Sequence, residues 1–393
     1  MTAPWCTFLL LSDDMPMDDK PALASRHGER LLAIDALRGF DMFWIIGGDR
    51  LGRALGQWSG TKAGHGLREQ LDHVEWEGFR FYDLIFPLFL FLVGAVLPFS
   101  LEKFRGDGRG AAYRRIARRT VLLFGLGLLA NGLLQFQWEE LRIAGVLQRI
   151  ALCYGISAVI SLNRSSRGIA LILASILLGY WALLANVAAP GGMPGDYTIE
   201  GNLPGWVDRH YLPGDIKEAY YGYGDNEGLL STVPAVATAL MGVLAGRWLR
   251  SGRGPWQKVG GLAVVGCTCL IIGAVWGQRF PIIKNLWTSS FVLVAGGLSL
   301  LLLAAFYAVL DVLRFRRWAF FFAVIGANAI TIYVAPRFID FSYFARFFLG
   351  GVYRLSGQYV SGDFRQVVEA AGVLAAEWLF LLYLYRNRIY LRV

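Results

Sequence analysis

Long apolar runs recur along this chain of 393 residues, and they constrain its fold more than any other feature. Each run has roughly 18–22 residues, close to the ~20 that an α-helix needs to cross the hydrocarbon core of a bilayer. Only 17% of the residues are charged, against about a quarter in soluble domains, so the chain has too little polar surface to cover itself in water. The sequence predicts an all-α, polytopic transmembrane helical bundle.

We predict about ten spans, or eleven if a short apolar stretch at 338–352 also crosses the bilayer. That stretch contains Arg346 and two glycines, which favours a re-entrant or interfacial segment. Residues 1–29 lack the pattern of a signal peptide and are expected to form a cytoplasmic tail, whereas residues 30–393 form one transmembrane domain. The ten expected spans are 31–50, 83–101, 119–136, 142–161, 168–188, 228–248, 258–277, 288–311, 318–336 and 366–386.

Charge is distributed unevenly between the two sets of loops. The short loops after the even-numbered spans are rich in arginine, whereas the long loops at about 51–82, 189–227 and 337–365 carry both signs. The positive-inside rule therefore places both termini in the cytoplasm and the long loops outside. The net charge of +9 then reflects topology and not nucleic-acid binding. The four cysteines lack metal-ligand spacing, and phosphate-loop, zinc-protease and serine-elbow motifs are absent, so no metal site is expected.

Ionisable residues inside the expected spans are candidates for function, because charge is costly in hydrocarbon. Asp35, Arg38 and Asp41 are spaced by three, so they share one helix face and could neutralise one another or hold a polar ligand. Gln148 and Arg149 lie about two turns into another apolar helix. A phosphate would suit Arg149, and so would a carboxylate of the first span.

His73 is the histidine with the most suggestive surroundings. It lies between Asp72 and Glu75, just ahead of the second span, in an outward loop. A neighbouring carboxylate can fix the tautomer of an imidazole, which suits a nucleophile or general base. An ordinary interfacial histidine would look the same. Further polar residues gather at later span ends: Asp225, Asn226, Glu227, Lys284, Asn285 and Asn328.

Six sequence blocks in order resemble the heparan-α-glucosaminide N-acetyltransferase family, which includes bacterial members. The resemblance runs from about residue 30 to the end. The blocks are Arg30–Asp41, His73 ahead of Tyr82–Pro87, Arg142–Arg149, Asn226–Gly228, Lys284–Trp287 and Ala327–Asn328.

The resemblance implies a membrane acetyltransferase that moves acetyl from cytoplasmic acetyl-CoA to the amino group of glucosamine, or of a related amino sugar or glycan, on the outer side. It makes His73 the catalytic residue. By spacing, Asp49 occupies a position where the family has an assisting asparagine; a carboxylate there could act as a base, which an amide cannot. We expect a multi-pass protein of the bacterial inner membrane, and a homodimer is left open.

The remaining candidates are assigned by the needs of acetyl transfer. Arg38, Arg149, Gln148, Lys284 and Asn285 are expected to contact acetyl-CoA, with the arginines of 114–119 near its phosphates, and Asp41, Glu227 and Asn328 to contact the acceptor. Asn285 or Asn328 could donate a hydrogen bond to the developing oxyanion. Two other functions stay open: a transporter of sugars or acylated sugars, and an O-acetyltransferase of an envelope polysaccharide.

Overall fold

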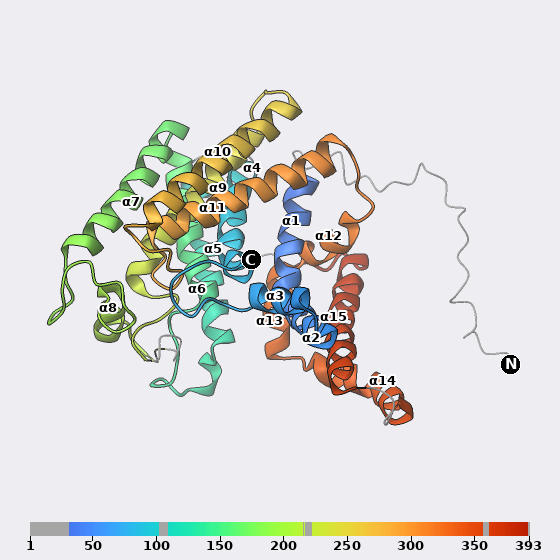
Figure 1. The fold of residues 1–393 in the computed structure, drawn as a ribbon. Coiled ribbons are helices and arrows are strands. Elements are labelled where there is room, and N and C mark those ends of the chain that lie inside the picture. Colours follow the sequence, from blue (N-terminus) through green and yellow to red (C-terminus); the bar gives the residue numbers. More distant parts are fainter. Residues whose placement is uncertain (1–30, 102–108, 215, 217–221, 357–360, 392–393) are drawn as a thin grey trace. The chain divides into compact units, whose positions relative to one another are not determined.

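The computed structural model describes residues 31–101, 109–214, 216, 222–356 and 361–391, and the predicted tail at 1–29 lies outside them. The described part is helical, with two isolated β-bridges and no strand (Figure 1). The longer helices are α1 Leu32–Phe43, α2 Asp49–Ser59, α3 Lys62–Leu71, α4 Ile85–Leu101, α5 Arg109–Ala130, α6 Val146–Asn163, α7 Ser166–Asn186, α8 Leu203–Tyr211, α9 Leu229–Leu249, α10 Pro255–Gly277, α11 Ser289–Tyr307, α12 Ala319–Ala327, α13 Ala329–Val334, α14 Phe341–Ser356 and α15 Gly362–Arg386. The short ones are η1 Trp44–Gly48, η2 Phe81–Leu84, η4 Leu133–Gln135, η6 Ala308–Val312 and η7 Ala335–Arg337.

Within the described residues, seven helices are long and apolar enough to cross a membrane. They match seven of the predicted spans to within a few residues and confirm the polytopic helical fold. The seven are Phe81–Leu101, Val146–Asn163, Ser166–Asn186, Leu229–Leu249, Pro255–Gly277, Ser289–Val312 and Gly362–Arg386.

This test of length and composition in the described residues finds fewer candidate spans than the ten expected, and the differences have local causes. The span expected at 318–336 is a pair of helices, α12 and α13, bent by 72° at Asn328, and counting it gives eight. The span expected at 31–50 is interrupted, because a π-helical turn and Gly47, with φ of +149°, kink the helix before α2. The span expected at 119–136 belongs to α5, whose first half is rich in arginine and which ends at Ala130. The short stretch at 338–352 falls in α14, which is not among the candidate spans.

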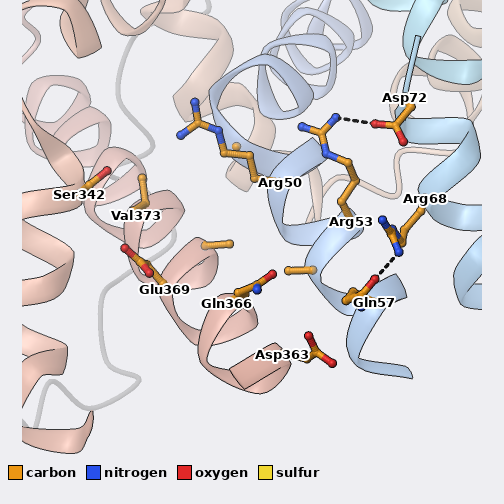
Figure 2. A pocket seen from close by; sticks show the side chains of 13 residues that line it. Arg50, Arg53, Gln57, Arg68, Asp72, Ser342, Asp363, Gln366, Glu369 and Val373 are labelled. Carbon is orange, nitrogen blue, oxygen red and sulfur yellow. Dashed lines mark hydrogen bonds and ion pairs between the residues drawn. The ribbon is translucent and has the colours of Figure 1, made fainter. Parts of the chain in front are cut away.

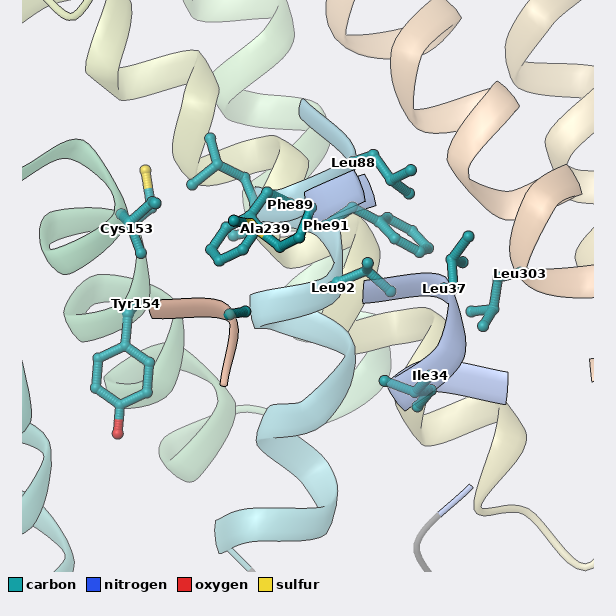
Figure 3. Packing of buried hydrophobic residues seen from close by; sticks show 14 of the residues in the cluster. Ile34, Leu37, Leu88, Phe89, Phe91, Leu92, Cys153, Tyr154, Ala239 and Leu303 are labelled. Carbon is teal, nitrogen blue, oxygen red and sulfur yellow. The ribbon is translucent and has the colours of Figure 1, made fainter. Parts of the chain in front are cut away.

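The central helices are α1, α4, α6, α9 and α11. The pairs α4–α9, α10–α11, α1–α12 and α5–α6 pack most extensively. Figure 3 shows Ile34 and Leu37 of α1 close to Leu92 of α4 and Leu303 of α11 within the main apolar cluster. By contrast, α7 and α10 are mostly exposed, and their exposed side chains include Leu171, Val264 and Ile271. Exposed apolar faces of this kind fit contact with lipid.

Glycines allow α4 and α9 to approach closely. A Cβ atom on Gly94 of α4 would lie 1.9 Å from the carbonyl oxygen of Ala239, and one on Gly242 of α9 would lie 1.9 Å from the carbonyl oxygen of Phe91. Small residues at helix crossings permit backbone contact, which replaces the hydrophobic effect as the source of packing energy in a membrane.

We expect Gly242→Leu to lower the thermal unfolding temperature of the detergent-purified protein, because a side chain there pushes α4 and α9 apart. Overpacking of this kind costs about 1–3 kcal/mol, and more where backbone is the obstacle. Gly179→Leu is the matched control, because Gly179 is exposed on α7 with no atom within 4 Å of an added Cβ. Equal unfolding temperatures for the two variants would contradict this account of the crossing.

Candidate active site

His73 lies in the extended segment between α3 and η2, and its nearest partners are Asp83 and Lys284. Its Nδ1 is 2.8 Å from Oδ1 of Asp83. Nζ of Lys284, from the turn between α10 and α11, lies 2.9 Å from Nδ1 and 3.3 Å from Nε2 of the same ring and 3.2 Å from Oδ1 of Asp83. The three side chains form one compact group, which we call the His73 triad.

The carboxylate of Asp83 is fixed by several donors. The backbone N–H groups of Val74 and Arg80 donate to its Oδ2, at 3.3 and 3.1 Å. Its side chain is 2% exposed, whereas that of His73 is 53% exposed. A buried carboxylate thus holds the inner edge of the imidazole, while the ring itself remains open to a substrate.

Lys284 brings a cation to this group. Burial lowers the pKa of its ammonium, and the nearby carboxylates of Asp83 and Glu227 oppose that shift. The antiparallel bridge between Glu77 and Ile283, with the Gly78 N–H donating to the Ile282 carbonyl, ties the loop of His73 to the turn of Lys284. Backbone pairing therefore sets the register between the two segments.

Tyr82 lies between Asp49 and His73 and contacts both side chains. The Asp49 carboxylate pairs with Arg53 one turn along α2 and lies beside the Tyr82 hydroxyl. The Tyr82 ring packs on the imidazole with 4.8 Å between ring centroids. Sequence reasoning placed Asp49 as a direct helper of His73; the structure places a tyrosine between them.

A second polar cluster lies beside the triad and contains Glu227. Arg142 donates to both carboxylate oxygens of Asp225, at 2.9 and 2.5 Å, and also pairs with Glu227. Burial would lower the pKa of Arg142, but these carboxylates raise it above its ordinary range. Nearby, burial raises the pKa of Asp208 to about 6, although the N–H groups of Leu229 and Asp225 donate to its carboxylate.

Arg149 is 1% exposed, and its guanidinium stacks over Trp287 at 5.0 Å from the ring centroid. Its Nη2 donates to the Gly228 carbonyl and the Ser231 hydroxyl, while Nε and Nη1 have no hydrogen-bond partner. The side-chain nitrogen of Gln148 is also buried without a partner. These unpaired donors suit a bound anion.

Three predicted site residues lie apart from the triad, near the interface of α1 with α12. Arg38 pairs with Asp35 at 3.0 Å and donates to the Gly326 carbonyl at 2.8 Å. Asp41 is fully buried, and neither of its carboxylate oxygens has a hydrogen-bond partner, so Arg38 neutralises Asp35 and not Asp41. Asn328 marks the bend between α12 and α13 and donates to the Ile389 carbonyl at 3.2 Å.

Asn285 is half-buried directly beside Lys284 in the same turn. Sequence reasoning assigned no role to Asp83, Tyr82 or Arg142, although each stands in a quoted motif. The signal in the sequence that could have identified Asp83 is an acidic residue at the start of an apolar span. Among the described residues no cluster of histidine, cysteine or carboxylate side chains could hold a metal ion.

Comparison with known proteins points in the same direction as the motifs. The chain is 25% identical to human heparan-alpha-glucosaminide N-acetyltransferase over 390 aligned residues and 26% identical to the mouse protein over 388. Both alignments cover 84% of this chain and 56% of the relative, so the chain spans about half the length of these curated proteins. No protein-family model matches it. The chain is a multi-pass membrane protein related in sequence to the heparan-alpha-glucosaminide N-acetyltransferases, as its motifs predicted.

Proposed function

We propose that this protein is a membrane acetyltransferase that moves an acetyl group from acetyl-CoA to the amino group of glucosamine or a related amino sugar, through His73. The relatives' names support transfer to an amino group of a glucosaminide. The observation that carries the proposal is the His73 triad: an exposed imidazole whose Nδ1 lies 2.8 Å from a buried carboxylate. We further propose a bacterial inner membrane as its location, with the acceptor on the outer side.

The triad suits acyl transfer because the Asp83 carboxylate engages only one of the two ring nitrogens of His73. With Nδ1–H donating to Asp83, the lone pair of Nε2 points away from the carboxylate and can receive an acyl group or a proton. The Lys284 ammonium, at 2.9–3.3 Å from both ring nitrogens, opposes a positive charge on the ring. A neutral imidazole is the form that can act as nucleophile or base.

Two routes use the same residues. In the first, Nε2 attacks the thioester carbonyl, the C–S bond breaks, and the sugar amine then displaces His73 from the acetyl carbon. In the second, Nε2 removes a proton from the amine as the amine attacks the thioester directly. In both routes, the proton that the amine releases neutralises the thiolate of CoA. Radiolabelled acetyl trapped on His73 in the absence of acceptor supports the first route, and a strictly ternary rate law supports the second.

The donor requires an anion site, and the chain offers two. Arg149 holds two buried, unpartnered nitrogens next to Trp287, close to the second polar cluster. Arg114, Arg115 and Arg118 are exposed along α5, on the segment predicted to face the cytoplasm. We propose that the α5 arginines meet the phosphates of CoA and that Arg149 lies further along its path. Turnover of acetyl-CoA by the purified protein, with glucosamine as acceptor, tests the function as a whole.

We expect activity to fall at alkaline pH as Lys284 loses its proton. Because burial lowers its pKa, the ammonium that pairs with Asp83 is lost below the usual lysine value of about 10.4. Lys284→Arg should move the alkaline limb of the kcat/KM profile to higher pH, because a guanidinium stays charged. Lys258→Arg, near the first turn of α10 and at the opposite end of that helix from Lys284, is the control and should leave the limb in place. An alkaline limb that does not move in Lys284→Arg would show that another group sets it.

A further inference from the structure

A polar pocket of ≈ 560 Å³ lies between α2 and α15, beside the loop that carries His73. Figure 2 shows Arg50, Arg53 and Gln57 of α2 on one side and Asp363, Gln366 and Glu369 of α15 on the other. The volume falls within the range of about 300–1,000 Å³ that is typical of small-molecule sites. None of the mechanism described above uses this space.

Positive and negative side chains line the pocket in equal number. Arg50, Arg53 and Arg68 face Asp72, Asp363 and Glu369. A chain of phosphates such as that of CoA would meet three carboxylates here, which disfavours it. A ligand with many hydroxyl groups is better suited, because hydroxyls donate to carboxylates and accept from guanidinium groups.

Two polar groups at the pocket have hydrogen-bonding capacity to spare. Arg50 is exposed, and no hydrogen bond or ion pair engages it in the described part of the chain. Glu377 is 3% exposed, its Oε2 lacks a hydrogen-bond partner, and that oxygen lies 3.9 Å from where a Cβ on Gly47 would stand. Gly47 itself lines the pocket, whereas Glu377 does not, so this carboxylate lies behind the pocket wall and adds negative charge there.

Aromatic rings flank the same pair of helices. Trp58 of α2 is 50% exposed and packs against Phe364 of α15, with 5.3 Å between ring centroids. Neither ring is among the residues that line the pocket, but the exposed indole offers a flat apolar surface on the same pair of helices.

The pocket is connected to the candidate catalytic residue. Arg53 pairs with Asp72, the residue directly before His73, and lies over the Tyr82 ring that packs on the imidazole. We propose that this pocket is a saccharide-binding subsite that holds the sugar unit following the acceptor amino sugar of a glycan. The proposal rests on the proposed function, and it adds that the preferred acceptor is an oligosaccharide and not a free monosaccharide.

The test compares glucosamine with a disaccharide of two glucosamine units as acceptors for the full-length protein. Arg50→Ala should raise the KM for the disaccharide about tenfold, as expected for a lost charge-assisted hydrogen bond, and leave the KM values for glucosamine and acetyl-CoA unchanged. Gln366→Ala should act in the same direction. Arg279→Ala, an exposed arginine in the turn after α10, is the matched control and should change none of the three.

Calorimetric binding of the disaccharide to a His73→Ala protein separates the subsite from the chemistry. Arg50-dependent binding without any acetyl transfer by the wild type would uphold the subsite and overturn the proposed function. A raised KM for acetyl-CoA in Arg50→Ala would place the donor in the pocket and overturn the subsite. An equal rise of KM for both sugars in Arg50→Ala, or no rise for either, would overturn the subsite as well.

Discussion

Replacing His73 by alanine is expected to lower kcat for acetyl transfer by about 10³-fold, within the range of 10²–10⁴ that is typical for loss of a general base. The exposed imidazole is the group that can reach a substrate, and Asp83 behind it is 2% exposed. The measurement is acetyl-CoA turnover with glucosamine by purified protein.

His65→Ala is the matched control for this experiment. His65 is an exposed histidine on α3, in the same loop between predicted spans, and it has no part in the triad. The His65→Ala variant should retain wild-type turnover. If His73→Ala kept full acetylation activity, the proposed function would be wrong. If both the wild type and His73→Ala moved sugar across the membrane of vesicles, a transporter would account for the chain better.

Replacing Arg142 by methionine is expected to have the largest effect on stability. The substitution leaves the carboxylates of Asp225 and Glu227 close together, with side-chain exposures of 0% and 10%. Removing one partner of a buried ion pair costs about 3–5 kcal/mol, because the remaining charge is uncompensated. Chemical unfolding in detergent, followed by tryptophan fluorescence, measures the change.

A rescue variant distinguishes lost charge balance from lost packing. Arg142→Met combined with Asp225→Asn and Glu227→Gln removes the charges together, and it should recover most of the lost free energy of unfolding. If the triple variant proved as unstable as the single one, the shape of the guanidinium and not its charge would be responsible.

The sequence predicted the spanning helices well where apolar length alone decides. The boundaries of the span that ends at Leu101 and of the one that begins at Leu229 agree with prediction to within two residues. Prediction from the sequence was less accurate where the backbone kinks or bends within an apolar stretch. The kink at Gly47 and the bend at Asn328 interrupt stretches that read as continuous apolar runs, because hydropathy does not record dihedral angles.

The candidate site was predictable in its parts and not in its assembly. Acidic neighbours singled out His73, but Lys284 was assigned to CoA, since a lone lysine ahead of a helix suggests an anion partner. Its position on the imidazole depends on the bridge between Glu77 and Ile283, which is a long-range pairing. Asp35 and Asp41 are both three residues from Arg38, so spacing alone cannot choose between them. The Gly326 carbonyl on α12 accepts from the guanidinium, which pairs with Asp35.

His73 and Lys284 are separated by 211 positions along the chain, and that separation has a consequence for biosynthesis. During translation the imidazole and Asp83 emerge long before Lys284, so a partly synthesised or truncated polypeptide carries the histidine and its carboxylate without the cation. Catalytic competence should therefore appear only once α10 and α11 have joined the bundle. Nascent or proteolysed fragments that lack Lys284 would have no acetyltransferase activity, even when they are correctly inserted in the bilayer.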